Sequence, residues 1–273
     1  MKLAFNPFAS SLVDRPRRLA RALRRRLASD AGPGPAGPTL IDAFAETYPD
    51  AVFVEIGSND GEQHDFLRAH ILSRNWTGVM VEPVPYVFER LARNYRHVDR
   101  VALENSAVAD RDGVLPFFHL AQADEGERAM LPPWYDGIGS LSRDAVVSHA
   151  DKVPNLERRL TRLEVPCLTF SSLCRRHGLA TVDLLLIDAE GSDRELLRHV
   201  DLGTFAPRLV IYEHFHLSPE DRAACRSEIE AHGYETMEEG FDTFCLRAGT
   251  PDELSRVWST LRPAPGLYVE DGL

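Results

Sequence analysis

The stretch VFVEIGSNDG, Val52–Gly61, decides the fold because it leads from a buried strand directly into a tight turn. Its first residues are Val, Phe and Ile, as in strands that are covered on both faces of a sheet. Gly57 and Gly61 then permit a turn in which the backbone approaches a ligand closely. Their spacing is G-x-x-x-G, whereas dinucleotide-binding turns carry G-x-G-x-x-G. The stretch therefore predicts a ligand-binding turn of another kind.

Strand and helix signals alternate after this turn. Helices are expected over residues 62–73, 86–95, 192–200 and 218–233. Strands are expected over residues 77–83, 100–110, 181–191 and 207–215, with a final pair over 234–239 and 242–248, and with 114–120 as a hairpin partner of the strand before it. Such alternation predicts an α/β fold, in which helices cover both faces of a doubly wound, mostly parallel sheet. Ligands of such sheets bind at the carboxyl ends of the strands.

The chain is expected to form one domain with an extension at each end. Residues 1–39 are interpreted as a basic arm followed by a Gly/Pro linker, AGPGPAGPT, Ala31–Thr39. The folded domain is expected to start near Leu40 and to extend over residues 40–250. Residues 251–273 are expected to form a C-terminal helix and a tail.

The charge of the chain is unevenly distributed. The net charge is −11, yet residues 1–30 hold eight basic and two acidic side chains. An acidic body argues against nucleic-acid binding through phosphates. In the arm, Leu19, Leu23 and Leu27 form one apolar stripe at helical spacing. The arm is therefore expected either to contact an anionic membrane or a partner, or to lie solvated against the acidic body.

Cysteines and apolar runs suggest the compartment. The four cysteines include no C-x-x-C pair, and no apolar run reaches the about 18 residues that a membrane span needs. No secretory signal is visible. We therefore expect reduced thiols and a cytoplasmic protein. Whether the chain forms a homo-oligomer is left open.

Acidic residues occur at the ends of the first two strands. Glu55 is costly inside a parallel strand unless a partner compensates its charge. A cationic cofactor would compensate it, whereas a pyrophosphate would be repelled. Glu82, 25 residues after Gly57, can accept both hydroxyls of a ribose. Together these acids predict S-adenosylmethionine, with its ribose on Glu82 and its methionine end over the glycine turn.

The predicted cofactor-binding residues follow from this placement, with Asn105, Ser106 and Ala107 of the third strand expected either to frame the adenine by backbone contacts or to be simple turn residues. They are Glu55, Gly57, Ser58, Asn59, Gly61, Glu82, Asn105, Ser106, Ala107 and Asp188.

The next two strands end in three polar side chains, Asp188, Glu213 and His214, which are the predicted catalytic residues. They are expected to converge beside the sulfonium. Asp188 and Glu213 can hold Mg²⁺, or His214 can act as a general base without a metal, or the cluster only shapes the pocket. The other histidines considered are expected to be structural or exposed: His119, His149 and His216.

Six blocks of the sequence together resemble, in order and spacing, the FkbM family of S-adenosylmethionine-dependent methyltransferases. They are VFVEIGSNDG, VMVEPVPYVFERLARN, NSAVADRDG, GIGSLSR, VDLLLIDAEG and LVIYEH, spread over residues 50–245. The resemblance implies a class I methyltransferase fold, Rossmann-like with seven strands, and O-methylation of a hydroxyl on a sugar or a secondary metabolite. It also implies that Asp188, Glu190 and Gly191 form the I-D-x-E-G block. Thr169-Phe170-Ser171 departs from the T-L-D that the family often has.

The resemblance leads to an expectation for residues 121–160, which are polar and irregular. They are expected to form a lid over the acceptor, with Gly137 and Gly139 as hinges and with Trp134 and Tyr135 stacking on a sugar face.

Two other functions stay open. A nicotinamide-dependent oxidoreductase on a Rossmann fold is disfavoured by Glu55 and by the absent G-x-G-x-x-G. A catalytically silent, methyltransferase-like binding module is disfavoured only weakly, by the intact acids at the strand ends.

Overall fold

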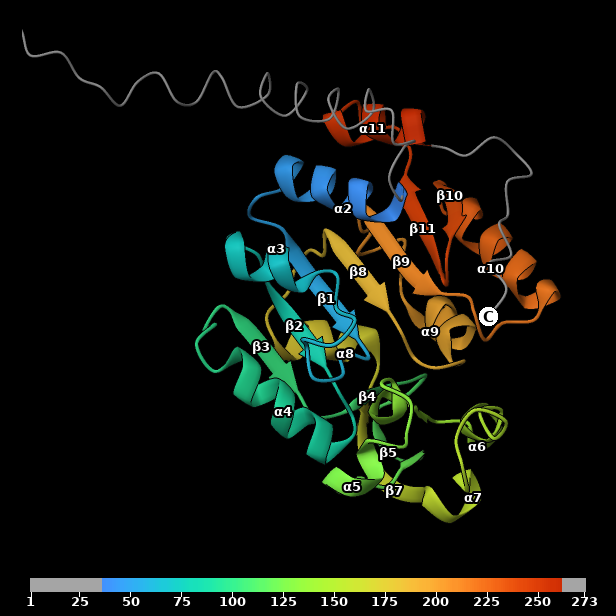
Figure 1. Cartoon of the computed structure of the whole chain (residues 1–273). Coiled ribbons are helices and arrows are strands. Elements are labelled where there is room, and N and C mark those ends of the chain that lie inside the picture. Colours follow the sequence, from blue (N-terminus) through green and yellow to red (C-terminus); the bar gives the residue numbers. More distant parts are fainter. Residues whose placement is uncertain (1–35, 262–273) are drawn as a thin grey trace, which may run out of the picture.

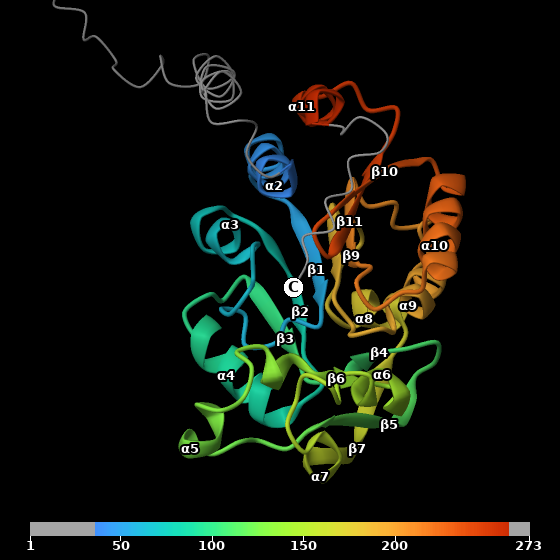
Figure 2. The same ribbon diagram turned by 45° about the vertical axis from the view of Figure 1, so that its right-hand side comes forward.

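The computed structural model describes residues 36–261. The predicted basic arm with its leucine stripe, the start of the linker and the tail after residue 261 lie outside the described residues. The described chain forms an α/β domain whose main sheet lies between two layers of helices (Figures 1 and 2). In this part of the chain, no helix has both the length and the apolar content that crossing a bilayer requires.

The main sheet has seven strands in the order β10-β11-β9-β8-β1-β2-β3. Its strands are β1 (Val52–Ile56), β2 (Thr77–Val81), β3 (Val101–Glu104), β8 (Leu184–Ile187), β9 (Leu209–Glu213), β10 (Tyr234–Glu239) and β11 (Asp242–Arg247). Strand β11 runs antiparallel to both of its neighbours, β10 and β9, and all other neighbouring pairs in this sheet are parallel. The chain proceeds outward from β1 to β3 and then returns to β8 on the other side of β1. The switch point, where ligands of open α/β sheets bind, therefore lies between β1 and β8.

Helices cover both faces of this sheet because its central strands are apolar on both sides. One layer holds α2 (Ala36–Thr47), α3 (Arg68–Ser73), α4 (Pro85–Tyr95) and α11 (Glu253–Leu261), and the other holds α8 (Phe170–Arg176), α9 (Asp193–His199) and α10 (Pro219–Ala231). Phe53 packs into the first layer and its neighbour Val54 into the second, as the two-residue period of a strand requires. Figure 2 shows the sheet edge-on between α3 and α4 on one side and α10 on the other.

Helix α2 begins at Ala36, inside the stretch predicted to be a linker. Pro38 lies in its first turn, where a missing N–H costs little. The N–H groups of Ala36 and Gly37 both donate to the carboxylate of Glu239 on β10. The predicted domain start near Leu40 was therefore too late, because an acceptor distant in sequence satisfies the start of the helix.

A second sheet corrects the predicted pairing of residues 114–120. Its four strands, in the order β4-β7-β5-β6, are β4 (Ala107–Val108), β7 (Leu160–Leu168), β5 (Gly113–Leu120) and β6 (Gly139–Ser140). Strand β5 pairs antiparallel with β7 over its whole length, so it is not a hairpin partner of the strand before it. The predicted strand over 100–110 is two short strands, β3 and β4, which belong to different sheets.

Residues 121–160, named the lid here, lie at the carboxyl ends of the main strands, toward which the arrowheads of β1 and β8 point (Figure 1). The lid holds the short helices α5 (Glu125–Arg128), η1 (Tyr135–Gly137), α6 (Arg143–Val147) and α7 (Leu156–Arg159), as well as β6. It has a small apolar core, in which Leu131, Tyr135, Ile138, Val146, Val153 and Leu156 pack together with Leu120 of β5. It is therefore a folded layer and not an irregular loop.

Gly57 joins the ends of three central strands. Its N–H donates to the carbonyl of Val81 at 3.0 Å, and the N–H of Asp188 donates to the carbonyl of Ile56 at 2.9 Å. The φ of Gly57 is 84°, and a Cβ there would lie 1.7 Å from the carbonyl oxygen of Asp188. Only glycine fits this position, both for backbone conformation and for space.

We expect Gly57→Ala to destabilise the protein far more than Gly233→Ala. Gly233 has a matching φ of 85°, but a Cβ added there would meet no atom within 4 Å beyond its chain neighbours. The control substitution should cost about 1–2 kcal/mol for the left-handed conformation. Gly57→Ala should cost at least about 1–3 kcal/mol more, because the backbone at Asp188 must move. Urea unfolding of both variants measures the difference, and equal losses would contradict the interpretation.

Candidate functional site

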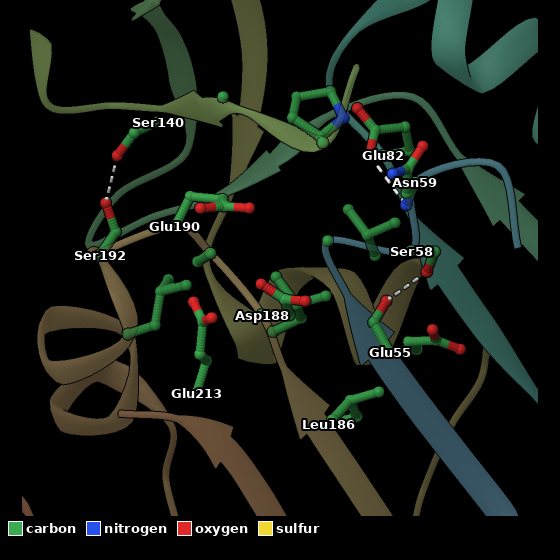
Figure 3. A pocket seen from close by; sticks show the side chains of 18 of the residues that line it. Glu55, Ser58, Asn59, Glu82, Ser140, Leu186, Asp188, Glu190, Ser192 and Glu213 are labelled. Atoms are coloured by element: carbon green, nitrogen blue, oxygen red, sulfur yellow. Dashed lines mark hydrogen bonds between the residues drawn. The ribbon is translucent and has the colours of Figure 1, made fainter. Parts of the chain in front are cut away.

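A cavity of about 660 Å³ lies at the carboxyl ends of the main strands, beneath the lid (Figure 3). Its size suits a small-molecule site. Nine of the residues predicted from the sequence line it, and they are Glu55, Gly57, Ser58, Asn59, Glu82, Ser106, Ala107, Asp188 and Glu213. Three predicted residues do not line it: Gly61, Asn105 and His214.

Glu82 is held in place at the end of β2 by two backbone donors. Its carboxylate accepts the N–H of Val84 at 2.7 Å on one oxygen and the N–H of Asn59 at 3.1 Å on the other. Burial raises the pKa of Glu82 to about 7, although these two hydrogen bonds oppose the rise. A carboxylate oxygen accepts more than one hydrogen bond, so Glu82 can still receive hydroxyl groups from a ligand.

Glu55, on the neighbouring strand β1, lacks a comparable partner. It is 3% exposed, and within the described chain its Oε2 has no hydrogen-bond partner. Burial, followed by the charges of Asp65 and Asp188, raises its pKa well above the ordinary value. Uncompensated carboxylates of this kind are costly. The arrangement therefore favours a positively charged ligand in the cavity.

Two predicted cofactor residues have supporting positions instead. Gly61 lies beneath the turn, where an added Cβ would be 2.5 Å from the ring of Tyr95. The side-chain amide of Asn105 donates to the carbonyls of Glu82 at 2.8 Å and of Pro83 at 3.2 Å. Asn105 thus braces the end of β2 from outside the cavity. The next two residues, Ser106 and Ala107, line the cavity instead.

The helix expected after the glycine turn starts later than predicted, at Arg68 rather than at residue 62. The N–H groups of Leu67 and Arg68 donate to Asp65 Oδ1 at 2.7 and 3.0 Å. The Asp65 side chain therefore occupies N–H groups at the start of this helix.

A second group of carboxylates lies across the cavity, at the ends of β8 and β9. Burial, with the charges of Asp188 and Glu190, raises the pKa of Glu213 far above its ordinary value. Desolvation, followed by the charges of Glu190 and Asp193, raises the pKa of Asp188. The surface of Asp188 nevertheless opens into the cavity, so water entering the cavity limits this rise. Carboxyl groups with raised pKa values thus gather at this wall.

His214 is not beside these carboxylates, and its predicted position was wrong. Successive residues at the end of a strand point to opposite faces, so Glu213 faces the cavity and His214 faces away. Its Nδ1 lies 2.9 Å from the hydroxyl of Thr243, and its backbone N–H donates to the carbonyl of Phe241.

Two histidines for which a structural or exposed role was expected take its place. His216 Nε2 lies 3.1 Å from Glu190 Oε2 and 3.6 Å from Glu213 Oε2. His149 Nε2, from the lid, lies 3.7 Å from the same oxygen of Glu190. The IDAEG block of the sequence indicated Glu190 as a site residue. No local sequence pattern connects His149 with the other residues of this group. His119 lies outside the cavity lining, with its Nδ1 2.8 Å from the carbonyl of Leu120.

The lid forms the remaining wall. Trp134 lines the cavity, whereas Tyr135 is fully buried and donates its hydroxyl to the carbonyl of Ala121, so it cannot stack on a ligand as predicted. The hydroxyls of Ser140 in the lid and of Ser192 at α9 lie 3.0 Å apart (Figure 3). Gly137 packs against the wall, since an added Cβ would be 3.2 Å from Asn59 Nδ2.

We expect Glu55→Gln to stabilise the ligand-free protein at about pH 8 by about 1–3 kcal/mol, because a buried charge without a partner is removed. Raised pKa values mean that the folded state binds more protons than the unfolded state, so stability falls as pH rises. For Glu82 this loss extends from its ordinary 4.5 to about 7.

Melting temperature measured from about pH 5 to about pH 8 should therefore fall, and less steeply in Glu55→Gln than in the parent. Glu164→Gln, at an exposed position on β7, is the matched control and should leave the slope unchanged. Identical slopes in the parent and Glu55→Gln would contradict the interpretation.

Comparisons with solved structures give distant likenesses. A methyltransferase FkbM from Methylobacillus flagellatus KT is 12% identical, with a TM-score of 0.46, over 85% of this chain and 59% of that chain. The present chain thus spans less than two thirds of that protein. A methyltransferase from Geobacter sulfurreducens is 14% identical, with a TM-score of 0.38, over 91% of this chain and 93% of that chain.

An RNA methyltransferase from Salinibacter ruber in complex with S-adenosyl-L-homocysteine is 14% identical, with a TM-score of 0.30, over 80% of this chain and 95% of that chain. No protein with a curated description matches the sequence.

The family is shown by the sequence profile of the Methyltransferase FkbM domain, which matches residues 55–236. This range begins at Glu55 and includes the glycine turn, the lid and the ends of β8 and β9. The seven-stranded sheet, with β11 as its antiparallel strand, confirms the predicted class I methyltransferase fold. The family supports S-adenosylmethionine-dependent methyl transfer. This chain belongs to the FkbM family of methyltransferases.

Proposed function

We propose that the protein is an S-adenosylmethionine-dependent O-methyltransferase that acts on a hydroxyl of a sugar or a secondary metabolite. One observation carries the proposal: a single cavity holds the buried carboxylates Glu55 and Glu82 on one wall and an acid–histidine group on the other. The first wall suits a cationic nucleoside. The second wall suits the removal of a proton from an acceptor.

The chemistry of the first wall supports the proposed position of the cofactor. The ribose hydroxyls donate to Glu82, and the methionine end lies over the turn at Gly57. The positive charges of the ligand compensate the unpaired carboxylate of Glu55, together with Asp188. The hydroxyl of Ser106 is buried with no hydrogen-bond partner in the described chain, so it can bind the adenine. A pyrophosphate beside Glu55 would be repelled, which disfavours a nicotinamide cofactor.

Methyl transfer needs an acceptor oxygen in line with the methyl–sulfur bond, and alignment alone is worth about 7–11 kcal/mol in well-oriented reactions. A hydroxyl also has to lose its proton. Asp188 and Glu213 are the proposed bases in their ionised forms, which burial opposes and which the positive charge of the bound cofactor stabilises. The proton passes to the carboxylate, the oxygen forms a bond to the methyl carbon, and the electrons of the broken carbon–sulfur bond stay on sulfur.

The acceptor class is proposed from the lining of the cavity opposite the glycine turn. Trp134, Phe215 and Phe241 offer aromatic rings next to carboxylates, a combination that suits the apolar face and the hydroxyls of a sugar. A Mg²⁺ ion on Asp188 and Glu213, contact of the basic arm with a membrane or a partner, and a homo-oligomer stay predictions. A silent binding module would bind the cofactor and methylate nothing.

We expect S-adenosylmethionine and S-adenosylhomocysteine to raise the melting temperature and NAD and NADP to have no effect. Glu82→Gln should weaken both nucleosides about tenfold, the loss of one hydrogen bond to a charged group. Glu55→Gln should weaken S-adenosylmethionine more than S-adenosylhomocysteine, because only the former carries the sulfonium charge. Calorimetry measures the affinities, with Glu164→Gln as the control. A melting temperature that rises with NAD alone would contradict the proposal.

Methyl transfer itself is tested with S-adenosylmethionine carrying an isotope-labelled methyl group and a panel of sugars, glycosides and phenolic metabolites, each paired with its amino analogue. We expect label on a hydroxyl of at least one member. Glu213→Gln should lower turnover by about 10²–10⁴-fold while cofactor affinity stays near that of the parent. His214→Gln, which faces away from the cavity, should retain turnover. Label on the amino analogues only would rule out the O-methyl assignment.

A further inference from the structure

Three side chains from three separate segments converge at the lid side of the cavity. His149 follows α6 in the lid, Glu190 follows β8, and His216 follows β9. One ligand atom from each of these residues lies within 4.8 Å of the other two. The rings of the two histidines are 4.8 Å apart between centroids.

The contacts within this group leave donor atoms without partners. His149 is 7% exposed, and its Nε2 has no hydrogen-bond partner in the described chain. Its distance of 3.7 Å from Glu190 Oε2 is too long for a hydrogen bond. The nitrogen nevertheless points at the carboxylate and at His216. A buried polar atom that lies among ligand-type groups without bonding to them calls for a further occupant.

The donor set indicates which occupant fits. Two imidazoles and one carboxylate are the three protein ligands of many catalytic zinc sites, which keep one coordination position open. Mg²⁺ prefers oxygen ligands and water, so it is a poorer match for two nitrogens.

We propose that His149, Glu190 and His216 form a binding site for a divalent transition-metal ion of the zinc type, with its open position facing the cavity. An ion there joins the lid to the ends of β8 and β9. Its role in catalysis rests on the proposed function: an acceptor hydroxyl bound at the open position is more acidic. Glu213, whose Oε2 lies 3.6 Å from His216 Nε2, is placed to take that proton.

The test measures metal binding directly. The full chain, prepared without a histidine tag and stripped with a chelator, is titrated with Zn²⁺ by calorimetry and with Co²⁺ by visible absorption. We expect one ion per chain. His149→Ala and His216→Gln should each weaken binding by at least about 100-fold, more than the loss of an outer partner usually costs.

His177→Ala is the matched control. His177 lies 2.8 Å from Glu104 Oε2, in a histidine–glutamate pair outside the cavity, so its removal should leave metal affinity unchanged. Circular dichroism checks that each variant folds. If His149→Ala does not fold, the Zn²⁺ affinity of His216→Gln, which changes a more accessible residue, tests the site alone. Equal Zn²⁺ affinities of the parent protein and of His216→Gln would overturn the proposed metal site.

Calorimetry with S-adenosylmethionine on the stripped protein separates this inference from the proposed function. Cofactor binding without Zn²⁺ binding refutes the metal site alone. Zn²⁺ binding that depends on both histidines, without any cofactor binding, supports the metal site and refutes the proposed function.

Discussion

The burial of Glu55 at the end of β1 is the constraint on which the rest of the site depends. An ionised carboxylate in that position is opposed by desolvation and by the neighbouring charges of Asp65 and Asp188. The apolar layers on both faces of the sheet supply the stability that makes such a group tolerable. The cavity is thus prepared for positive charge at the expense of stability, as is common where function requires an unfavourable local arrangement.

The topology divides the cavity into two chemically different walls. Strands β1 and β2 lie on one side of the switch point and carry Glu55 and Glu82, whereas β8 and β9 lie on the other and carry Asp188 and Glu213. Parallel strands bring all four ends to one edge of the sheet. At Gly57 the backbone of β1 touches that of β8, which holds the two walls at a fixed separation.

The lid supplies what the main sheet lacks. It rests on the second sheet and shares a small apolar core with Leu120 of β5, so it can hold His149 and Trp134 firmly over the strand ends. Asp136 anchors it to α4 through Arg90, whose Nη1 lies 2.8 Å from Asp136 Oδ2. The group of His149, Glu190 and His216 therefore forms where lid and sheet come together. Under the proposed function, an acceptor approaches the methyl group at that junction.

Local sequence determined much of this protein. The apolar run that ends at Ile56, with the glycine turn behind it, predicted both β1 and the site, because burial on two faces and tight turns leave short-range patterns. Glu82, Asp188 and Glu213 were found for the same reason, as acids that end apolar strands.

Only the tertiary structure decided the rest. Three features depend on groups that lie far apart along the chain. They are the pairing of β5 with β7, the start of α2 against Glu239, and the presence of His216 and His149 at the cavity in place of His214. A strand pattern records how deeply a segment is buried but not which segment lies beside it. One residue of strand alternation was enough to turn His214 away from the cavity.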